Sequence, residues 1–266
     1  MSIALVDCNN FFVSCERIFN PSLRSKPVLV VSGNGGCVVA RSKEVKELGI
    51  KVGEPLFKIK DIVKLHNIEV YNANFELYTD ISRRVMSILY EYSYDVEITS
   101  IDEGYLDFNQ FQIDTHTLRA HNIKNTILKW VGIPVSVGIG DNRTQAKVAT
   151  HIAKKESQFN GVCNLNELEY SQIEEYFKRF EVGDIWGIGR QSAMKLNLLG
   201  VRTMYDFISL DEKWVFKNFD KPLYITYKEM KGEKVDNMLS HYVNDRKSVS
   251  MSRSFNNNIN NYLLKK

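Results

Sequence analysis

Short, apolar-rich runs recur along the first half of the chain. Residues 3–6 and 27–31 are runs of this kind, bounded by polar residues, and they predict buried strands. Residues 37–40 follow the turn cluster at 32–36, which predicts a hairpin between the second and third strands. A further run at 135–140 predicts another strand. The pattern therefore indicates a sheet whose strands are spread widely along the sequence.

Apolar residues at helical spacing fill much of the sequence between these strands. Segment 61–95 shows this spacing most clearly, through Leu77, Ile81 and Val85, and it predicts a core-facing helix. Combined with the strands, the order of elements predicts the α+β class, with an antiparallel sheet that carries its helices on one face. The other helices predicted from spacing lie at residues 11–18, 41–48, 118–130 and 144–155.

From residue 171 the chain changes to a small helical module. Residues 171–174 read as a capping box that starts one helix, and residues 182–189 lead into the next, at 190–199. A helix, a Gly-x-Gly turn and a helix form a helix-hairpin-helix pattern. Gly187 and Gly189 would let backbone N–H groups approach a phosphate of nucleic acid without reading its sequence. The alternative is an ordinary helical turn in which glycines allow close packing.

Residues 248–255 alternate serine with Val249, Met251, Arg253 and Phe255, which is the pattern of one half-buried strand. The asparagine-rich stretch that follows predicts no strand to pair with it. A single strand without a sheet is unusual. We therefore expect that a further domain is missing from this chain.

Two neighbouring carboxylates, Asp102 and Glu103, stand at the turn of a predicted hairpin. Residues 97–107 alternate as a strand does, and successive strand residues face opposite ways, so the two carboxylates converge only if the strand ends or bends there. Gly104 permits such a bend. Two interpretations fit this stretch by itself: an exposed acidic turn, or a site that binds a cation.

Asp7 supplies a third carboxylate, at the end of the first predicted strand. That strand can lie beside the hairpin in the same sheet. Three carboxylates around one point repel one another unless they share protons or bind cations, and oxygen-rich sites of this kind suit Mg²⁺. Two Mg²⁺ ions would make a phosphoryl-transfer centre. We therefore expect Asp7, Asp102 and Glu103 to be both catalytic and metal-binding.

Two groups of basic residues stand out in the sequence. Arg41, Lys43 and Lys46 lie close together, either on a solvated helix face or where a triphosphate binds. The second group recurs at i, i+4 and i+7 of a predicted helix, a spacing that is typical of a solvent-facing stripe. It consists of Lys147, His151 and Lys154.

The composition limits the broad class of the protein. The chain has 266 residues, enough for more than one hydrophobic core, and its 44% hydrophobic and 25% charged residues are those of an ordinary globular protein. A net charge of +3 permits a polyanionic partner without requiring one. The four cysteines include no C-x-x-C pair, which predicts neither a zinc site nor a disulfide framework and favours a cytoplasmic location. No signal or membrane-spanning segment is predicted.

Together these segments resemble the Y-family translesion DNA polymerases, and most closely the UmuC-like branch, to which the catalytic subunit of DNA polymerase V belongs. The motifs follow the family's order as far as about Phe255. They are Asp7-x-Asn9-x-Phe11-Phe12-x-Ser14-Cys15-Glu16, residues 36–42 with Glu44 and Lys46, Tyr78-x-x-x-Ser82, residues 100–103, Gly138-Ile139-Gly140 with Ala146-Lys147 and Ala153-Lys154, and residues 186–189.

The resemblance implies a right-hand polymerase core. Its antiparallel-sheet palm would comprise residues 1–10 and 72–162, and its small fingers residues 11–71. Residues 163–235 would form a helical thumb that contains the helix-hairpin-helix. Residues 236–266 would be a linker and the truncated start of a little-finger domain. In family members this domain is complete, and it is often followed by a tail that binds the sliding clamp.

The resemblance also implies roles for single residues. Asp7, Asp102 and Glu103 would hold two Mg²⁺ ions, and Phe12 would be the steric gate that excludes a ribose 2′-OH. DNA would contact the hairpin through Gly187, Gly189 and Arg190. Contacts with the incoming nucleotide are implied for Phe11, Phe12, Arg41, Lys43, Lys46 and Lys154.

The sequence therefore predicts an error-prone, template-directed DNA polymerase that extends a primer opposite damaged template with deoxynucleoside triphosphates. By resemblance its partners would include primer–template DNA, a UmuD-like accessory subunit, RecA and the sliding clamp. One alternative is a catalytically impaired remnant that only binds DNA or polymerase partners. Another, a helix-hairpin-helix DNA glycosylase, is disfavoured because it leaves Asp7 and the Asp102–Glu103 pair without a task.

Overall fold

The computed structural model describes residues 2–33, 36–233 and 235. Among these, residues 2–9 and 82–235 belong to one unit (unit 1), and residues 10–81 belong to a second (unit 2). The strand predicted at 248–255 lies outside the described residues. Among the helices that the structure describes, none combines the length and the apolar character needed to cross a bilayer.

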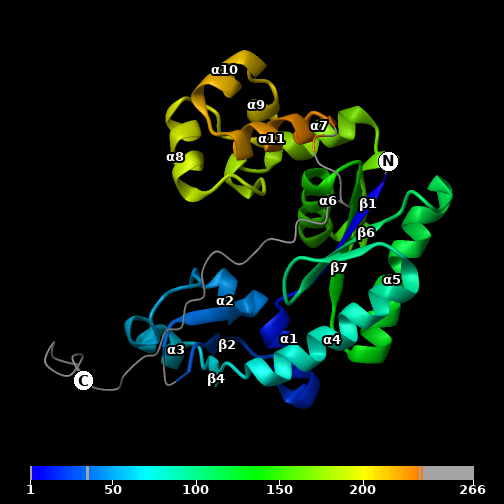
Figure 1. Cartoon of the computed structure of the whole chain (residues 1–266). Helices are drawn as coiled ribbons and strands as arrows, with labels where there is room; N and C mark the ends of the chain where they lie inside the picture. Colours follow the sequence, from blue (N-terminus) through cyan, green and yellow to red (C-terminus); the bar gives the residue numbers. More distant parts are fainter. Residues whose placement is uncertain (1, 34–35, 234, 236–266) are drawn as a thin grey trace, which may run out of the picture. The chain divides into compact units, whose positions relative to one another are not determined.

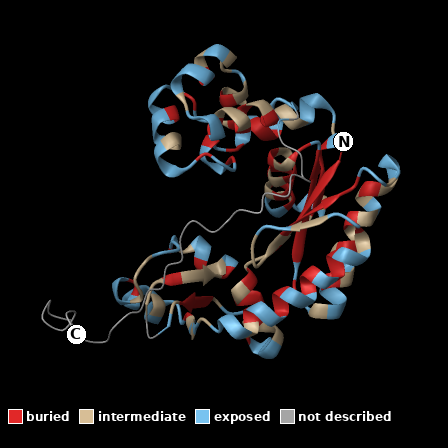
Figure 2. Cartoon of the chain, viewed as in Figure 1, coloured by how far each residue is buried: buried red, intermediate tan, exposed pale blue. Residues whose placement is uncertain are grey.

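A five-stranded sheet forms the centre of unit 1 (Figure 1). The central strands are buried on both faces, as their apolar sequences require, and they appear red in Figure 2. The predicted hairpin and the antiparallel arrangement are present, but the last strand runs parallel to its neighbour, which the sequence analysis did not predict. The order is β5 (Val96–Ile98), β6 (Glu103–Asp107), β1 (Ile3–Cys8), β7 (Val135–Gly140) and β8 (Val162–Asn164).

Helices cover both faces of this sheet, so the prediction of helices on one face was wrong. A Cβ on Gly104 would meet Leu89 of helix α4 (Phe75–Tyr92), whereas a Cβ on Gly138 would meet Thr150 of helix α6 (Arg143–Lys155). These two glycines pair with successive residues of β1, and successive strand residues face opposite ways. Helix α5 (His116–Val131) lies beside α4, because Tyr92 and Thr126 are hydrogen bonded.

Gly138 brings the backbone of α6 directly onto β7. An added Cβ would lie closer to the Thr150 amide nitrogen than Cβ atoms lie in real structures. We expect Gly138→Ala to lower the free energy of unfolding by about 3 kcal/mol, at the upper end of overpacking effects. Urea denaturation measures this change. Gly183→Ala is the matched control, because its Cβ would meet Ala193 at an ordinary 3.5 Å; equal stability of the two variants would contradict the close packing.

The helical part of unit 1 shares one hydrophobic core with α6. Val148 and Ile152 of α6 belong to the same buried cluster as Phe177, Leu196 and Tyr227. The first helix is capped by Glu169 with Gln172, so the capping box predicted at residues 171–174 was placed two residues too late. The helices are α7 (Tyr170–Arg179), α8 (Arg190–Leu198), α9 (Met204–Ile208), α10 (Glu212–Asn218) and α11 (Lys221–Met230).

Unit 2 is a small three-stranded sheet with helices. Strand β2 (Val28–Val31) pairs antiparallel with β3 (Val38–Arg41), as predicted, and parallel with β4 (Glu69–Asn72). Strand β4 falls inside the segment predicted as helical from 61 to 95, because the chain turns at Asn67, whose φ is 47°. The helices of this unit are α1 (Phe11–Phe19), α2 (Lys43–Glu47), α3 (Lys60–Leu65) and the first turns of α4.

Candidate active site

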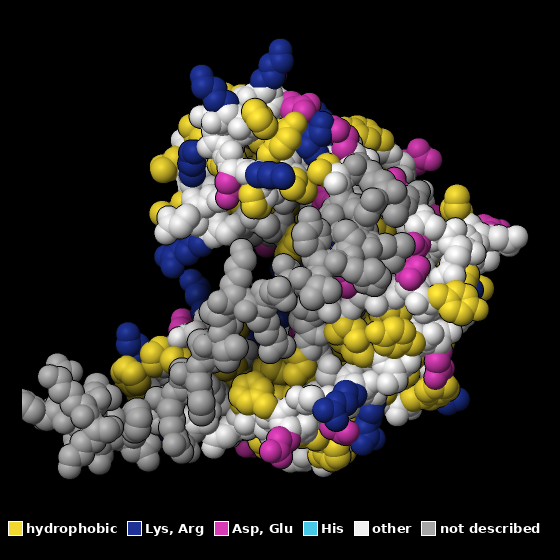
Figure 3. Space-filling model, viewed as in Figure 1, with side chains coloured by type: hydrophobic (Ala, Val, Ile, Leu, Met, Phe, Trp, Pro, Cys, Tyr) yellow, Lys and Arg dark blue, Asp and Glu magenta, His cyan; other side chains and the backbone are white. Residues whose placement is uncertain are grey.

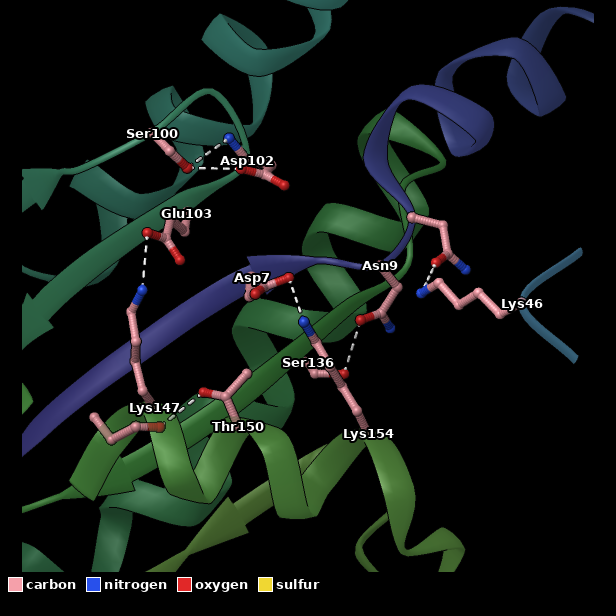
Figure 4. Close-up of polar contacts among 12 residues, drawn as sticks. Asp7, Asn9, Lys46, Ser100, Asp102, Glu103, Ser136, Lys147, Thr150 and Lys154 are labelled. Atoms are coloured by element: carbon pink, nitrogen blue, oxygen red, sulfur yellow. Dashed lines mark hydrogen bonds and ion pairs between the residues drawn. The ribbon is translucent and has the colours of Figure 1, made fainter. Parts of the chain in front are cut away.

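Asp7 and Glu103 lie opposite each other on neighbouring strands. Asp7 is the last residue but one of β1, and its partners are Glu103 at the start of β6 and Ser136 on β7. Paired residues of an antiparallel ladder point to the same face of a sheet. For these three residues that face is the one covered by α6, because Gly138 lies two residues from Ser136 and meets that helix. Figure 4 shows the arrangement.

Asp102 is held beside these two residues by the hairpin bend. The Cys8 amide donates a hydrogen bond to the carbonyl oxygen of Asp102 at 2.9 Å, which ties the bend to the end of β1. Ser100 Oγ donates to Asp102 Oδ1 at 2.6 Å, and Thr99 Oγ1 donates to Glu103 Oε1 at 3.1 Å. The bend thus precedes Glu103, whereas Gly104 lies within β6, where its missing side chain makes room for α4.

Two lysines of α6 form ion pairs with carboxylates on the face of the sheet that this helix covers. Lys154 Nζ lies 2.6 Å from Asp7 Oδ1, and Lys147 Nζ lies 3.2 Å from Glu103 Oε1 (Figure 4). The spacing of this stripe by itself predicts a solvent-facing surface, so no role in the site was expected for Lys147. The spacing of seven residues was a usable signal, because it puts both side chains on one face of the helix.

The electrostatic balance at Asp7 is that of a site short of positive charge. Burial raises the pKa of Asp7 above its ordinary value, and the charges of Asp102 and Glu103 raise the pKa further. Lys154 lowers the pKa of Asp7 without cancelling these effects. Three carboxylates within electrostatic reach of one another, one of them desolvated, are the kind of oxygen donor set that Mg²⁺ prefers.

The three carboxylates do not converge closely enough to form a complete metal-binding site. Within residues 2–33, 36–233 and 235, no three Asp, Glu, His or Cys side chains are grouped closely enough to hold an ion as they stand. Lys154 and Lys147 instead serve as internal counterions. The donor set fits Mg²⁺, and the side chains have to reorient from these lysines to take it up.

Asn9 and Ser136 support the end of β1. The Asn9 amide donates to the carbonyl of Pro134 at 2.8 Å, and Ser136 Oγ donates to Asn9 Oδ1 at 3.0 Å. Asn9 entered the sequence analysis only as a motif position, and Ser136 gave no signal there. These bonds fix the backbone immediately after Asp7.

A cavity of about 550 Å³ opens beside the carboxylates. The sheet and α6 contribute one wall, and residues 183–189, which we call the glycine loop, contribute the other. The structure therefore brings two of the three predicted carboxylates, Asp7 and Glu103, to one cavity in unit 1 with Lys154 and the glycines of the predicted helix-hairpin-helix. The residues from the sheet and α6 are Leu5, Asp7, Glu103, Lys147, Thr150, His151 and Lys154.

Gly187 and Gly189 of the loop are glycine for different structural reasons. Gly187 has a φ of 89°, and a Cβ there would lie 2.6 Å from Thr226 Oγ1, so the fold itself requires glycine. A Cβ on Gly189 would meet nothing within 4 Å, which leaves the N-terminus of α8 open. Arg190 follows as an exposed residue. Lys and Arg side chains also stand out around the helical part in Figure 3.

The aromatic residues predicted to contact a nucleotide lie in unit 2. The Phe12 ring stacks on the Tyr78 ring with a centroid distance of 4.4 Å and an angle of 14°. Tyr78 is buried and donates to Glu16 Oε1 at 2.6 Å, which holds this surface rigid. Phe11 is 4% exposed, so only its backbone at the start of α1 is available for a ligand.

The basic residues of unit 2 differ in their surroundings. Arg41 donates from Nη1 to the Ile50 carbonyl. Lys46 Nζ lies 2.5 Å from Asn10 Oδ1, at the residue that precedes α1. Lys43 is exposed at the first position of α2. Their roles toward a nucleotide remain predictions.

Comparison with known proteins identifies the family. Residues 6–151, more than half of the chain, match the impB/mucB/samB family. The chain belongs to the impB/mucB/samB family. UmuC of Salmonella typhimurium is a relative that is 38% identical over 262 residues, covering 97% of this chain and 61% of that protein. DNA polymerase IV of Saccharolobus solfataricus is 34% identical over 220 residues, covering 79% of this chain and 59% of that protein.

Two solved structures share the fold of this chain. DinB from Sulfolobus solfataricus matches with a TM-score of 0.73 at 28% identity, covering 87% of this chain and 67% of its own. An insertion ternary complex of Dbh DNA polymerase matches with a TM-score of 0.74 at 27% identity, covering 89% of this chain and 69% of the Dbh chain. The predicted Y-family resemblance and fold are confirmed. The chain spans about three-fifths of the length of the curated relatives that it matches.

Proposed function

We propose that this chain is the catalytic core of a translesion DNA polymerase, which adds deoxynucleotides to a primer 3′-hydroxyl opposite damaged template. The observation that carries the proposal is the meeting of Asp7, Asp102 and Glu103 on adjoining strand ends, opposite two lysines of α6. The names of the relatives and the Dbh ternary complex support the same class of reaction.

Asp7, Asp102 and Glu103 are the residues that would hold two Mg²⁺ ions. When bound, such ions lower the pKa of an attacking hydroxyl and neutralise charge on a leaving phosphate. The protein contributes a partly desolvated carboxylate at Asp7 and a hairpin fixed to β1 by the bond from Cys8 to Asp102. These features orient the carboxylates before substrate arrives.

Cationic side chains would bind the triphosphate. Lys154 becomes available when Asp7 turns to another cation, and its flexible ammonium is suited to phosphate oxygens. In unit 2 we assign the same task to Arg41, Lys43 and Lys46. Phe12 would pack against the sugar and exclude a 2′-hydroxyl, while the backbone at Phe11 would face phosphate at the start of α1.

The domain assignment is part of the proposal. Residues 1–10 and 72–162 would act as palm, 11–71 as fingers and 163–235 as thumb, with 236–266 leading into a little finger. The glycine loop and Arg190 would grip the DNA backbone. A UmuD-like subunit, RecA and a sliding clamp are partners that we propose from the family resemblance.

Primer extension tests the proposed function. Purified chain is incubated with Mg²⁺ and a primed template, and each deoxynucleoside triphosphate is supplied singly. We expect addition of the nucleotide that the template dictates, and loss of addition with EDTA. DNA binding measured by anisotropy, with no extension at high enzyme and DNA concentrations, would support the alternative of a DNA-binding remnant. Extension that ignores the template base would overturn the assignment.

Arg190→Gln tests the proposed grip on DNA. Arg190 is exposed at the start of α8, beside the open Gly189 position, so its guanidinium would contact a phosphate. Loss of one phosphate contact should weaken binding for all sequences alike and reduce the slope of log K against log salt by about one. Anisotropy at several salt concentrations measures the slope. The control is Lys129→Gln, on the α5 side of the sheet; an equal slope change there would contradict a local contact.

A further inference from the structure

Lys147 has two partners on opposite sides of the cavity. Its Nζ lies 3.2 Å from Glu103 Oε1 and 4.8 Å from the centre of the Trp186 ring in the glycine loop. The Lys147 and Glu103 side chains are 18% and 19% exposed, so water screens their attraction only in part. A cation over the face of tryptophan is attracted by the ring quadrupole. One ammonium group therefore touches both a carboxylate of the site and the loop that faces it.

The loop and α6 keep a fixed spacing. Ile185 and Ile188 of the loop are buried in the cluster that also contains Val148 and Ile152 of α6. His151 Nε2 lies 3.6 Å from Asp184 Oδ2 one helical turn further along. Because these contacts hold the loop against the helix, Lys147 changes partner by rotating its side chain, without a movement of the loop.

We propose that Lys147 is a positioning residue that couples Glu103 to Trp186, so that a divalent cation at the carboxylates moves the Lys147 ammonium from Glu103 toward the Trp186 ring. The coupling rests on the proposed function, because it takes the carboxylates as the cation site. A cation on Glu103 removes much of the pull on Lys147, while the attraction of the ring remains. The contact between Lys147 and Trp186 in the glycine loop would therefore depend on whether a cation is bound at the carboxylates.

Two other basic residues of α6 lie on the same side of the helix as Lys147. His151 lies one turn along α6 on the cavity side, and Lys154 lies one turn beyond it, paired with Asp7. A cation at the carboxylates would also engage Asp7, so Asp7 does not replace Glu103 as an acidic partner of Lys147. The Trp186 ring is the contact already in place, and at 51% exposure it has room to receive the ammonium.

The fluorescence of Trp186 tests the coupling without measuring catalysis. Trp130→Phe and Trp214→Phe leave Trp186 as the sole tryptophan, because the chain contains three. Titration of this parent protein with MgCl₂ should change the Trp186 emission and reach saturation. The change should disappear in Lys147→Gln and persist in Lys147→Arg, which keeps a cation over the ring. Lys155→Gln, an exposed lysine of the same helix, is the matched control and should keep the full change.

The outcomes separate the coupling from the proposed function. A parent response that persists unchanged in Lys147→Gln but disappears in Glu103→Gln would show a cation site without coupling, and would overturn the inference alone. A parent with no response to MgCl₂ would overturn the coupling, whereas template-directed primer extension that depends on Mg²⁺ would still support the proposed function. Circular dichroism checks the fold of each variant, and Lys147→Met, which removes the charge and keeps an unbranched side chain, takes the place of Lys147→Gln if that variant does not fold.

Discussion

Asp7→Asn should abolish primer extension and yet raise thermal stability. Loss of a carboxylate that holds the ions and places the reacting groups should lower the rate by about 10³-fold, the scale of removing one electrostatic element from an active site. The side chain keeps its size, so β1 and its pairing with β6 and β7 should be preserved. Single-turnover extension measures the loss. Asp102→Ala and Glu103→Ala should show losses of similar scale.

The stability gain follows from the sign of the pKa shift at Asp7. Its pKa is raised from the ordinary 3.8, chiefly by burial, so the folded protein holds this proton more tightly than the unfolded chain. The contribution of Asp7 to stability therefore falls as pH rises from about 3.8 through the folded pKa, and the cost is complete above it. Asparagine mimics the neutral form and removes that cost.

Melting temperatures in EDTA measure this second effect. The difference between Asp7→Asn and the parent should be small at low pH and grow toward neutral pH. Asp114→Asn, at an exposed carboxylate away from the sheet, should change neither extension nor melting. Normal extension by Asp7→Asn would remove Asp7 from the site, and a lower melting temperature at neutral pH would show that its pairing with Lys154 outweighs burial.

Phe12→Ala should let ribonucleotides enter the growing strand. The Phe12 ring rests on the buried Tyr78, which Glu16 holds through a 2.6 Å hydrogen bond, so the ring cannot retreat from a bulkier sugar. A hydrophobic wall of this kind gives discrimination of roughly 10–200-fold. We expect the ratio of kcat/KM for ribonucleotide over deoxynucleotide to rise by about that factor.

Steady-state extension with the two matched triphosphates measures this ratio. Phe19→Ala is the control, because Phe19 is a largely exposed phenylalanine at the far end of the same helix. It should leave the ratio unchanged. An unchanged ratio in Phe12→Ala, with the protein folded and extending deoxynucleotides, would show that another residue performs the exclusion.

Much of the strand framework could be predicted because its residues are buried from both sides. The runs at 3–6, 27–31 and 135–140 became β1, β2 and β7, and the acidic hairpin became β5 and β6. Strand β8 has three residues, too few for a periodic signal, and β4 has four residues within a segment of helix-like spacing. The sequence did not reveal that helices cover both faces of the sheet. Periodicity identifies which side of a helix is buried, but it does not identify the element against which that side packs.

The site shows the same limit in its charged residues. Asp102 and Glu103 were ambiguous in the sequence, because the contacts that place their bend at the end of β1 are the pairing of Glu103 with Asp7 and the bond from Cys8 to Asp102. Lys147 was assigned to solvent because nothing in a helical stripe indicates which surface lies opposite. Gly104 was expected to bend the chain, whereas it makes room for α4; spacing alone cannot separate these two uses of glycine.

The contact of α6 with the glycines of β7 limits how the lysines of this helix can move. A Cβ on Gly140 would lie 2.6 Å from Gln145, and Gly138 allows an equally close approach one turn further along, so the helix cannot slide over the strand without a clash. Lys147 and Lys154 must then leave their carboxylates by rotamer changes. The release of these lysines should therefore not require a movement of the backbone of α6.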